Sequence, residues 1–169
     1  MKKLIVSHGL ITGGVVAAML VFTFSGSPKE YANSELIGYT IMIIAFSTIF
    51  FATRSYRDKQ PGGNMSFGQA FRVGLGITLV ASIIYVIAWM VISNTIAKDY
   101  MTEYYQQSVE QLKTSGLSEA ELTEKIEEIE RFTELYKNPI VKISITFLEI
   151  FPVGFIVSLV SALILKRKT

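Results

Sequence analysis

Hydrophobic residues fall into four long blocks along the chain, and polar segments separate them. The blocks cover residues 4–24, 36–53, 73–97 and 140–165. Each block can cross the hydrocarbon core of a membrane, which takes about 20 residues of helix. Because lipid offers the backbone no hydrogen-bond partner, each block is expected to be helical. The pattern predicts an all-α, polytopic membrane protein: a single membrane domain, residues 1–169, with four transmembrane helices.

The third helix is predicted to begin before its apolar block and to continue beyond it. Ser66 followed by Gln69 is typical of a capping box, so we expect this helix to start at residue 66 and to span the membrane over residues 66–97. The next helix breaker is Gly116. Residues 66–115 would then form one rod about 75 Å long.

The fourth helix is predicted to be preceded by a helix that returns to the membrane. Ser118 followed by Glu121 is a second capping box, and Asn138-Pro139 indicates a break at the membrane surface. Helices three and four would thus extend into a helical hairpin over residues 98–138. Its thin packing seam is expected to consist of Met101, Tyr105, Ser108, Leu112, Leu122, Ile126, Ile129, Thr133 and Tyr136.

Basic residues cluster at the block ends that four crossings place on one side of the membrane. They are Lys2, Lys3, Arg54, Arg57, Lys59, Arg72, Lys166, Arg167 and Lys168. Residues 98–138 instead hold ten acidic and five basic residues. Since positive charge near span ends marks the cytoplasmic side, we expect both termini in the cytoplasm and an extracytoplasmic hairpin. The first block is longer than a signal-peptide core, so it is expected to be a retained anchor.

Small residues recur at helical spacing in several blocks, which lets helix backbones approach closely in lipid. The positions expected to pack helices are Gly9, Gly13, Ala17, Gly74, Gly154, Ser158 and Ala162. Packing within the chain is the simpler interpretation. The alternative is that one such seam binds a partner.

Glu149 is the only acidic residue within the four blocks. Ionised and facing lipid, it would cost at least about 3 kcal/mol. We therefore expect it to face the bundle interior, to be neutral at pH 7 and to hydrogen-bond Tyr85 or Ser82 on the third helix. Pro152 removes a backbone donor and indicates a local break in the fourth helix. Two interpretations of this candidate intramembrane polar site stay open: a proton or ion site, or a structural carboxyl.

Other residues give few signs of chemistry. His8 is expected to be a packed, hydrogen-bonded residue, because a metal site needs further ligands at the same depth. The chain has no cysteine, which excludes disulfides and cysteine nucleophiles. No spacing typical of a catalytic motif occurs. We therefore predict no enzyme activity, no metal and no cofactor. The basic clusters are explained by topology, so nucleic acid is not an expected partner.

Several short segments together resemble a known family. They are Tyr56-Arg57-Asp58-Lys59, Gly62-Gly63, Phe67-Gly68-Gln69-Ala70-Phe71, Tyr85 with Trp89, Glu149 with Pro152, and residues 158–168. Their order and spacing resemble the family called domain of unknown function 4199, which consists of small four-helix membrane proteins of Bacteroidota. The resemblance implies a bacterial inner (cytoplasmic) membrane. It implies no activity and no site residues.

Two functions are compatible with these features. The first is a non-enzymatic accessory or scaffold subunit that self-associates or joins a larger membrane complex. The thin hairpin seam and the lack of catalytic motifs favour it. The alternative is a small oligomeric carrier or proton-linked transporter that uses Glu149. A cavity lined by Glu149 would favour transport, and a large exposed apolar patch on the hairpin would favour a scaffold.

Overall fold

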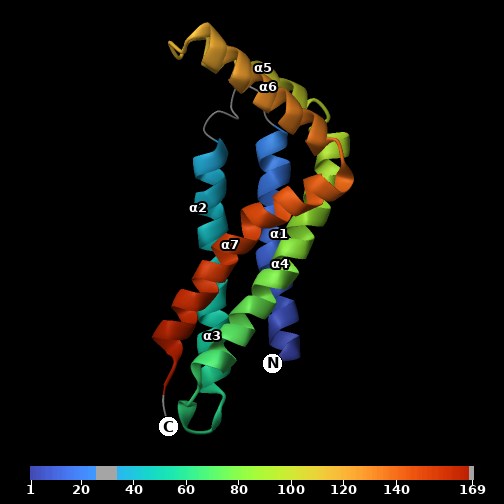
Figure 1. The fold of residues 1–169 in the computed structure, drawn as a ribbon. Helices are drawn as coiled ribbons and strands as arrows, with labels where there is room; N and C mark the ends of the chain where they lie inside the picture. The colour runs from blue at the N-terminus through green and yellow to red at the C-terminus, as the bar shows by residue number, and fades with distance from the viewer. Residues whose placement is uncertain (26–33, 168–169) are drawn as a thin grey trace.

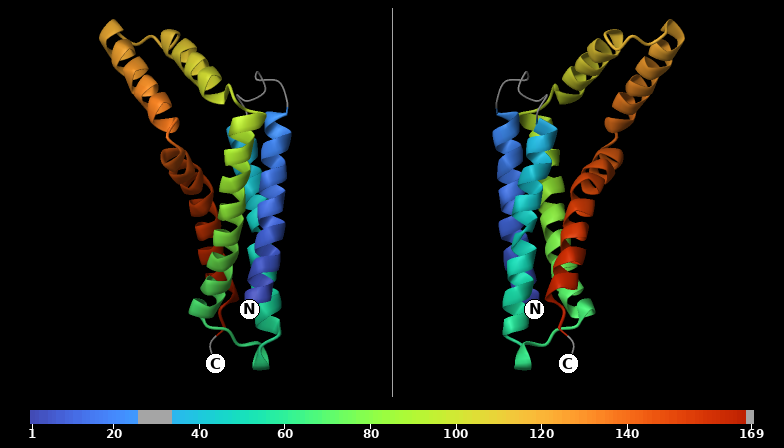
Figure 2. Two further views of the ribbon diagram at one scale, coloured as in Figure 1. Left: turned by 90° about the vertical axis from the view of Figure 1, so that its right-hand side faces the viewer. Right: turned by 90° about the vertical axis from the view of Figure 1, so that its left-hand side faces the viewer.

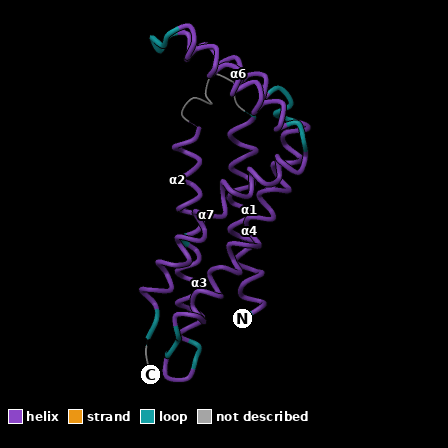
Figure 3. The backbone as a smooth tube through the Cα atoms, viewed as in Figure 1, coloured by secondary structure: helices purple, strands orange, loops and turns teal. Residues whose placement is uncertain are grey.

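The computed structural model describes residues 1–25 and 34–167. Its elements, in chain order, are α1 (Lys2–Phe24), α2 (Ser34–Phe46), α3 (Thr48–Asp58), a 3-10 turn η2 (Pro61–Gly63), α4 (Phe67–Thr95), α5 (Tyr100–Lys113), α6 (Glu119–Tyr136) and α7 (Pro139–Leu165). Among the described residues, four helical segments are long and apolar enough to cross a membrane. They are α1, the pair formed by α2 and α3, α4, and α7. The predicted all-α membrane architecture is confirmed. Figure 3 shows that short loops join the helices from α3 to α7.

The two ends of the bundle carry different parts of the chain. Both chain termini and the η2 loop lie at one end, and α5 and α6 lie at the other (Figure 1). The backbone N–H of Arg167 donates to the carbonyl of Met65 over 3.0 Å, which ties the end of α7 to the start of α4. This arrangement is the one expected for four crossings with both termini on the same side.

The second membrane-spanning segment consists of two helices, interrupted at Ser47. The Ser47 hydroxyl donates to a carbonyl three residues earlier, a local bond that competes with regular helix. The predicted span, residues 36–53, covered only the apolar part of this segment. The helix continues to Asp58, whose carboxylate pairs with Arg54 at 3.8 Å and with Arg57 at 2.8 Å. The apolar block therefore ends where charged residues begin, whereas α3 continues through them to Asp58.

The continuous rod predicted for residues 66–115 is wrong, because α4 ends at Thr95 and α5 starts at Tyr100. The side chains of Asn94 and Thr95 each donate to a carbonyl one turn earlier, at 2.6 and 2.8 Å. The backbone N–H of Ala97 donates to the carbonyl of Ile92, five residues earlier, over 2.9 Å. Side chains that bond back to the helix in this way bend or end it without glycine or proline.

Small residues on α1 set its contact with α4. A Cβ on Gly9 would lie 2.6 Å from the Cβ of Val80, and one on Gly13 would lie 2.6 Å from Ile84. Either methyl group would force the two backbones apart. Ala17, one turn further along α1, is half-buried.

Small residues also set the contact between α4 and α7. A Cβ on Gly74 would lie 2.8 Å from Ser158, and one on Gly154 would lie 2.5 Å from a methyl group of Thr78. The Thr78 and Ser158 hydroxyls are 3.0 Å apart and share a hydrogen bond. Ala162, one turn beyond Ser158, is fully buried. These positions pack helices of the same chain against one another.

The helices α5 and α6 contact each other, and the chain reverses between them at Gly116, where φ is 74°. Both predicted capping boxes are confirmed, at Ser66 for α4 and at Ser118 for α6. Figure 2 shows that α6 and the adjoining part of α7 lean away from α1 and α4. The bundle is therefore more open near the hairpin than near the termini.

Candidate functional site

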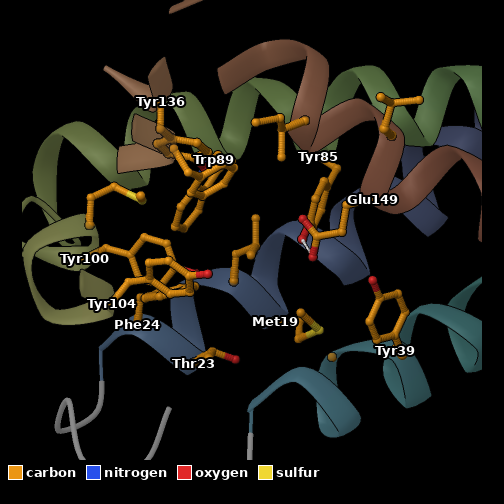
Figure 4. A pocket seen from close by; sticks show the side chains of 16 residues that line it. Met19, Thr23, Phe24, Tyr39, Tyr85, Trp89, Tyr100, Tyr104, Tyr136 and Glu149 are labelled. Carbon is orange, nitrogen blue, oxygen red and sulfur yellow. Dashed lines mark hydrogen bonds between the residues drawn. The ribbon is translucent and has the colours of Figure 1, made fainter. Parts of the chain in front are cut away.

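Where α7 leans away from the bundle, the described residues line an open cavity of about 500 Å³. Its walls come from α1, α2, α4, α5, α6 and α7 (Figure 4). Around Gly154, small residues allow α4 and α7 to touch. Further along, the bulky side chains of Tyr85 and Trp89 stand on the facing side of α4. The change from small to large residues along this face accounts for the divergence of the two helices.

Glu149 lies on the wall of this cavity. The hydroxyl of Tyr85 donates to its Oε1 over 3.2 Å, so the structure brings together the two residues paired in the sequence prediction. The Tyr85 side chain is only 2% exposed, whereas Glu149 is exposed. The sequence had predicted that this carboxyl faces the bundle interior. In the structure it is accessible instead, because the cavity reaches it. In Figure 4 the hydroxyl of Tyr39, on α2, is turned toward the same part of the cavity.

Two other residues of the predicted polar site lie differently from expectation. Ser82 is fully buried, and its hydroxyl has no hydrogen-bond partner among the residues that the structure describes. Pro152 lies within α7, which continues from Pro139 to Leu165. The break predicted at Pro152 is therefore absent. Membrane helices tolerate an internal proline where other groups or local adjustments of the helix satisfy the freed backbone.

Aromatic side chains form the part of the cavity wall near the hairpin. Trp89 lies 4.9 Å from Phe24 and 5.3 Å from Tyr100, measured between ring centroids. Tyr104 then connects Tyr100, at 6.4 Å, to Phe132, at 6.1 Å. These rings form one continuous group, which we call the aromatic cluster: Phe24, Trp89, Tyr100, Tyr104, Phe132 and Tyr136.

Tyr136 closes the aromatic cluster by returning to Trp89. The Trp89 indole N–H donates to the Tyr136 hydroxyl over 2.7 Å, and both side chains are buried. Burial raises the pKa of Tyr136, so its phenol remains uncharged. The ammonium group of Lys142 lies 5.5 Å from the centre of the Tyr136 ring and donates to Ser93 over 3.4 Å. The positively charged ammonium group of Lys142 thus lies at the edge of the aromatic cluster.

His8 lies elsewhere, on α1. Its Nδ1 is 3.0 Å from the carbonyl of Leu4, one turn earlier on the same helix. In the part of the chain that the structure describes, no three His, Cys, Asp or Glu side chains gather closely enough to hold a metal ion.

The aromatic cluster was not predicted from the sequence. Trp89, Tyr100 and Tyr104 look like membrane-interface anchors, and Tyr136 like a seam residue of the hairpin. A signal was present in the four-residue spacing of Tyr100 with Tyr104 and of Phe132 with Tyr136. Such spacing places each pair on one helix face, next to the membrane surface.

The family of the chain follows from comparison with known sequences. The profile of the family described as Protein of unknown function (DUF4199) matches residues 7–167. The chain belongs to this family. No curated protein and no solved structure matches it. The description of the DUF4199 family gives no activity, so the chemistry of the site has to be argued from its own residues.

Proposed function

We propose that this DUF4199 protein is a small proton-linked carrier of the bacterial inner membrane, and that the Glu149 cavity is its working site. Its termini would face the cytoplasm, and the hairpin would lie on the opposite side. The observation that carries the proposal is the cavity of about 500 Å³ with a carboxyl group on its wall. Ligand pockets of proteins have volumes of about 300–1,000 Å³.

The energetics of Glu149 support a role in proton exchange. An ionised carboxylate at this depth costs at least about 3 kcal/mol unless it is paired or hydrated. The cavity brings this carboxyl within reach of a ligand or of water. The Tyr85 hydroxyl, 3.2 Å away, can stabilise the ionised form by donating to it. A proton and a ligand can thus alternate at one carboxyl, which a proton-linked carrier requires.

The scaffold role, which the sequence favoured, stays a prediction. It called for a packed interior and a large apolar patch on the hairpin. Among the described residues of the hairpin, the exposed large apolar side chains are few: Tyr104, at 37%, Leu117, at 40%, Phe132, at 37%, and Leu135, at 60%. Phe132 belongs to the cavity wall. The geometry therefore favours the carrier. Self-association remains part of the proposal, since four helices enclose little room for a pathway.

Cysteine labelling tests the carrier directly, because the natural sequence has no cysteine. Met19→Cys would place a thiol on the cavity wall, and Ser82→Cys would place one in a fully buried position of α4 as the matched control. We expect a membrane-impermeant maleimide to label Met19→Cys from both sides of sealed vesicles and to leave Ser82→Cys unlabelled. Labelling from one side alone would contradict a carrier. Absence of labelling from either side would contradict an accessible cavity.

A further inference from the structure

A second cavity, of about 470 Å³, lies at the end of the bundle that carries both chain termini (Figure 1). The start of α4 and the residues that follow α7 line it, and it shares no lining residue with the Glu149 cavity. We propose that this cavity binds the phosphate headgroup of an anionic phospholipid, and that an acyl chain of the same lipid lies along phenylalanine rings of α4 and α7. The site does not depend on a carrier function.

The charge of the cavity wall selects an anion. Lys166 and Arg167 both line the cavity, and among the described lining residues none is acidic. The backbone N–H of Arg167 donates to the carbonyl of Met65 over 3.0 Å, which holds the two basic residues beside the start of α4. Basic pockets between membrane helices bind the headgroups of anionic lipids. A phosphate in this cavity would therefore meet two positive side chains at once.

Few acidic side chains are near enough in the chain to neutralise these two charges. The sequence has one acidic residue between residues 36 and 98, which include α3 and α4, and none in residues 150–169. The one acidic residue is Asp58, and its carboxylate already pairs with Arg54 at 3.8 Å and with Arg57 at 2.8 Å. The end of α7 therefore carries a net positive charge that an anionic headgroup can balance.

The start of α4 adds to this attraction. The first backbone N–H groups of a helix have no acceptor within the helix and carry partial positive charge, which favours a phosphate there. Ser66, the N-cap residue of α4, lines the cavity, and open space surrounds Gly68 in the first turn. The helix start thus supports the same charge that Lys166 and Arg167 select.

A continuous row of phenylalanine rings leads from this cavity along the membrane-spanning helices α4 and α7. Phe67, which lines the cavity, stacks on Phe71 with 5.8 Å between ring centroids. Phe71 lies 5.6 Å from Phe155 on α7. Phe151 is 6.0 Å from Phe155, and Phe147 is 4.9 Å from Phe151. We call these five rings the phenylalanine row.

The phenylalanine row ends at an apolar groove between α4 and α7. Phe147 lines this groove, together with Ile83 and Ile87, which are 55% and 59% exposed. In a bilayer such a surface faces acyl chains, and because all lipid chains are similarly apolar, the headgroup determines which lipid binds. A charged cavity continuous with an apolar row matches one molecule with a charged head and an apolar chain. A free phosphate would use only the cavity.

The test titrates the purified full chain, in detergent micelles, with phosphatidylglycerol and counts bound lipid by native mass spectrometry. Phosphatidylcholine with the same acyl chains is the matched control, because its headgroup has no net charge. We expect phosphatidylglycerol to bind at least about ten-fold more tightly. Lys166→Gln combined with Arg167→Gln should weaken its binding about thirty-fold, equivalent to about 2 kcal/mol for two charges. Lys2→Gln combined with Lys3→Gln removes two exposed charges from the same end of the bundle and should leave binding unchanged.

A photoreactive lipid locates the acyl chain. Phosphatidylglycerol with a diazirine in one chain should form adducts on residues 67–71 and 147–155, and excess unlabelled phosphatidylglycerol should suppress them. Glycerol 3-phosphate, which has the phosphate without the chains, should not suppress them.

Each other outcome would overturn the proposal. Equal affinity for the two lipids would reject an anionic headgroup site, and equal weakening by the two double variants would show general attraction between charges. Suppression of the adducts by glycerol 3-phosphate would identify a free phosphate as the ligand. Adducts spread evenly over the four spans would reject the phenylalanine row. If the variant at Lys166 and Arg167 fails to fold, the comparison of lipids and the adducts on the natural chain still decide.

Discussion

The hydrogen bond between Trp89 and Tyr136 joins the hairpin to the membrane bundle. Tyr136 is the only α6 side chain that is buried among the described residues, and its hydroxyl accepts from the Trp89 indole N–H over 2.7 Å. Tyr136→Phe would remove the acceptor and keep the ring. The buried N–H of Trp89 would then lack its partner, which costs about 1–3 kcal/mol. We expect the free energy of opening α6 to fall by this amount.

Limited proteolysis can measure this change. Trypsin can cut α6 after Lys125 and Arg131 once the helix opens. When opening and closing are fast, cleavage follows the population of the open form, so a loss of about 1.4 kcal/mol raises its rate about ten-fold. Tyr105→Phe is the control, because it removes the same hydroxyl from a half-buried position of α5. It should change the stability by less than about 0.5 kcal/mol.

A double-mutant cycle isolates the bond itself. Trp89→Phe removes the donor, and its effect should overlap with that of Tyr136→Phe, because each change breaks the same contact. Equal cleavage rates for Tyr136→Phe and the natural chain would refute the reasoning. Purely additive effects in the cycle would show that the two side chains act independently.

Four further predictions concern packing, the hairpin and topology. Gly154→Ala should lower the melting temperature, since its Cβ would lie 2.5 Å from Thr78 and overpacking costs about 1–3 kcal/mol; Gly14→Ala, with open space at that position, should not. Ile126→Asp should increase protease cleavage of residues 98–138, because it puts a charge into the half-buried seam of the hairpin. Hydrogen bonds from Ser118 hold the pKa of Glu121 below its usual value of 4.5, so the capped first turn of α6 is most stable above that pH. Its amide protection, corrected for intrinsic exchange, should fall as the pH drops through the lowered pKa, and Glu121→Gln should remove this dependence. Reporter fusions at Gly116 and at the C-terminus should report opposite compartments, and the same compartment for both would contradict the four-span topology.

Local chemistry made part of the fold predictable. The capping boxes at Ser66 and Ser118 depend on residues three positions apart, so the sequence alone identifies where α4 and α6 begin. The four apolar segments follow from the length that a membrane requires. The pairing of Glu149 with Tyr85 could be predicted from the free-energy cost of a carboxyl in lipid, because such a group needs a partner at its own depth.

Features that depend on packing between distant segments were not predictable in this way. The interruption at Ser47 involves a residue that is common inside membrane helices. The helix α7 runs through Pro152, which lies on an exposed side of the helix. The exposure of Glu149 depends on where α7 leaves the bundle, which no residue of α7 determines alone.

The break between α4 and α5 connects the unpredicted part of the fold to the candidate site. In one continuous helix, Trp89 and Tyr100 would be about 16 Å apart along the axis. Their ring centroids are 5.3 Å apart in the structure, because the chain turns between Thr95 and Tyr100 and α5 folds back toward the bundle. The bend at the end of α4 thereby creates the aromatic cluster. A straight rod would have left the cavity around Glu149 without the rings of α5.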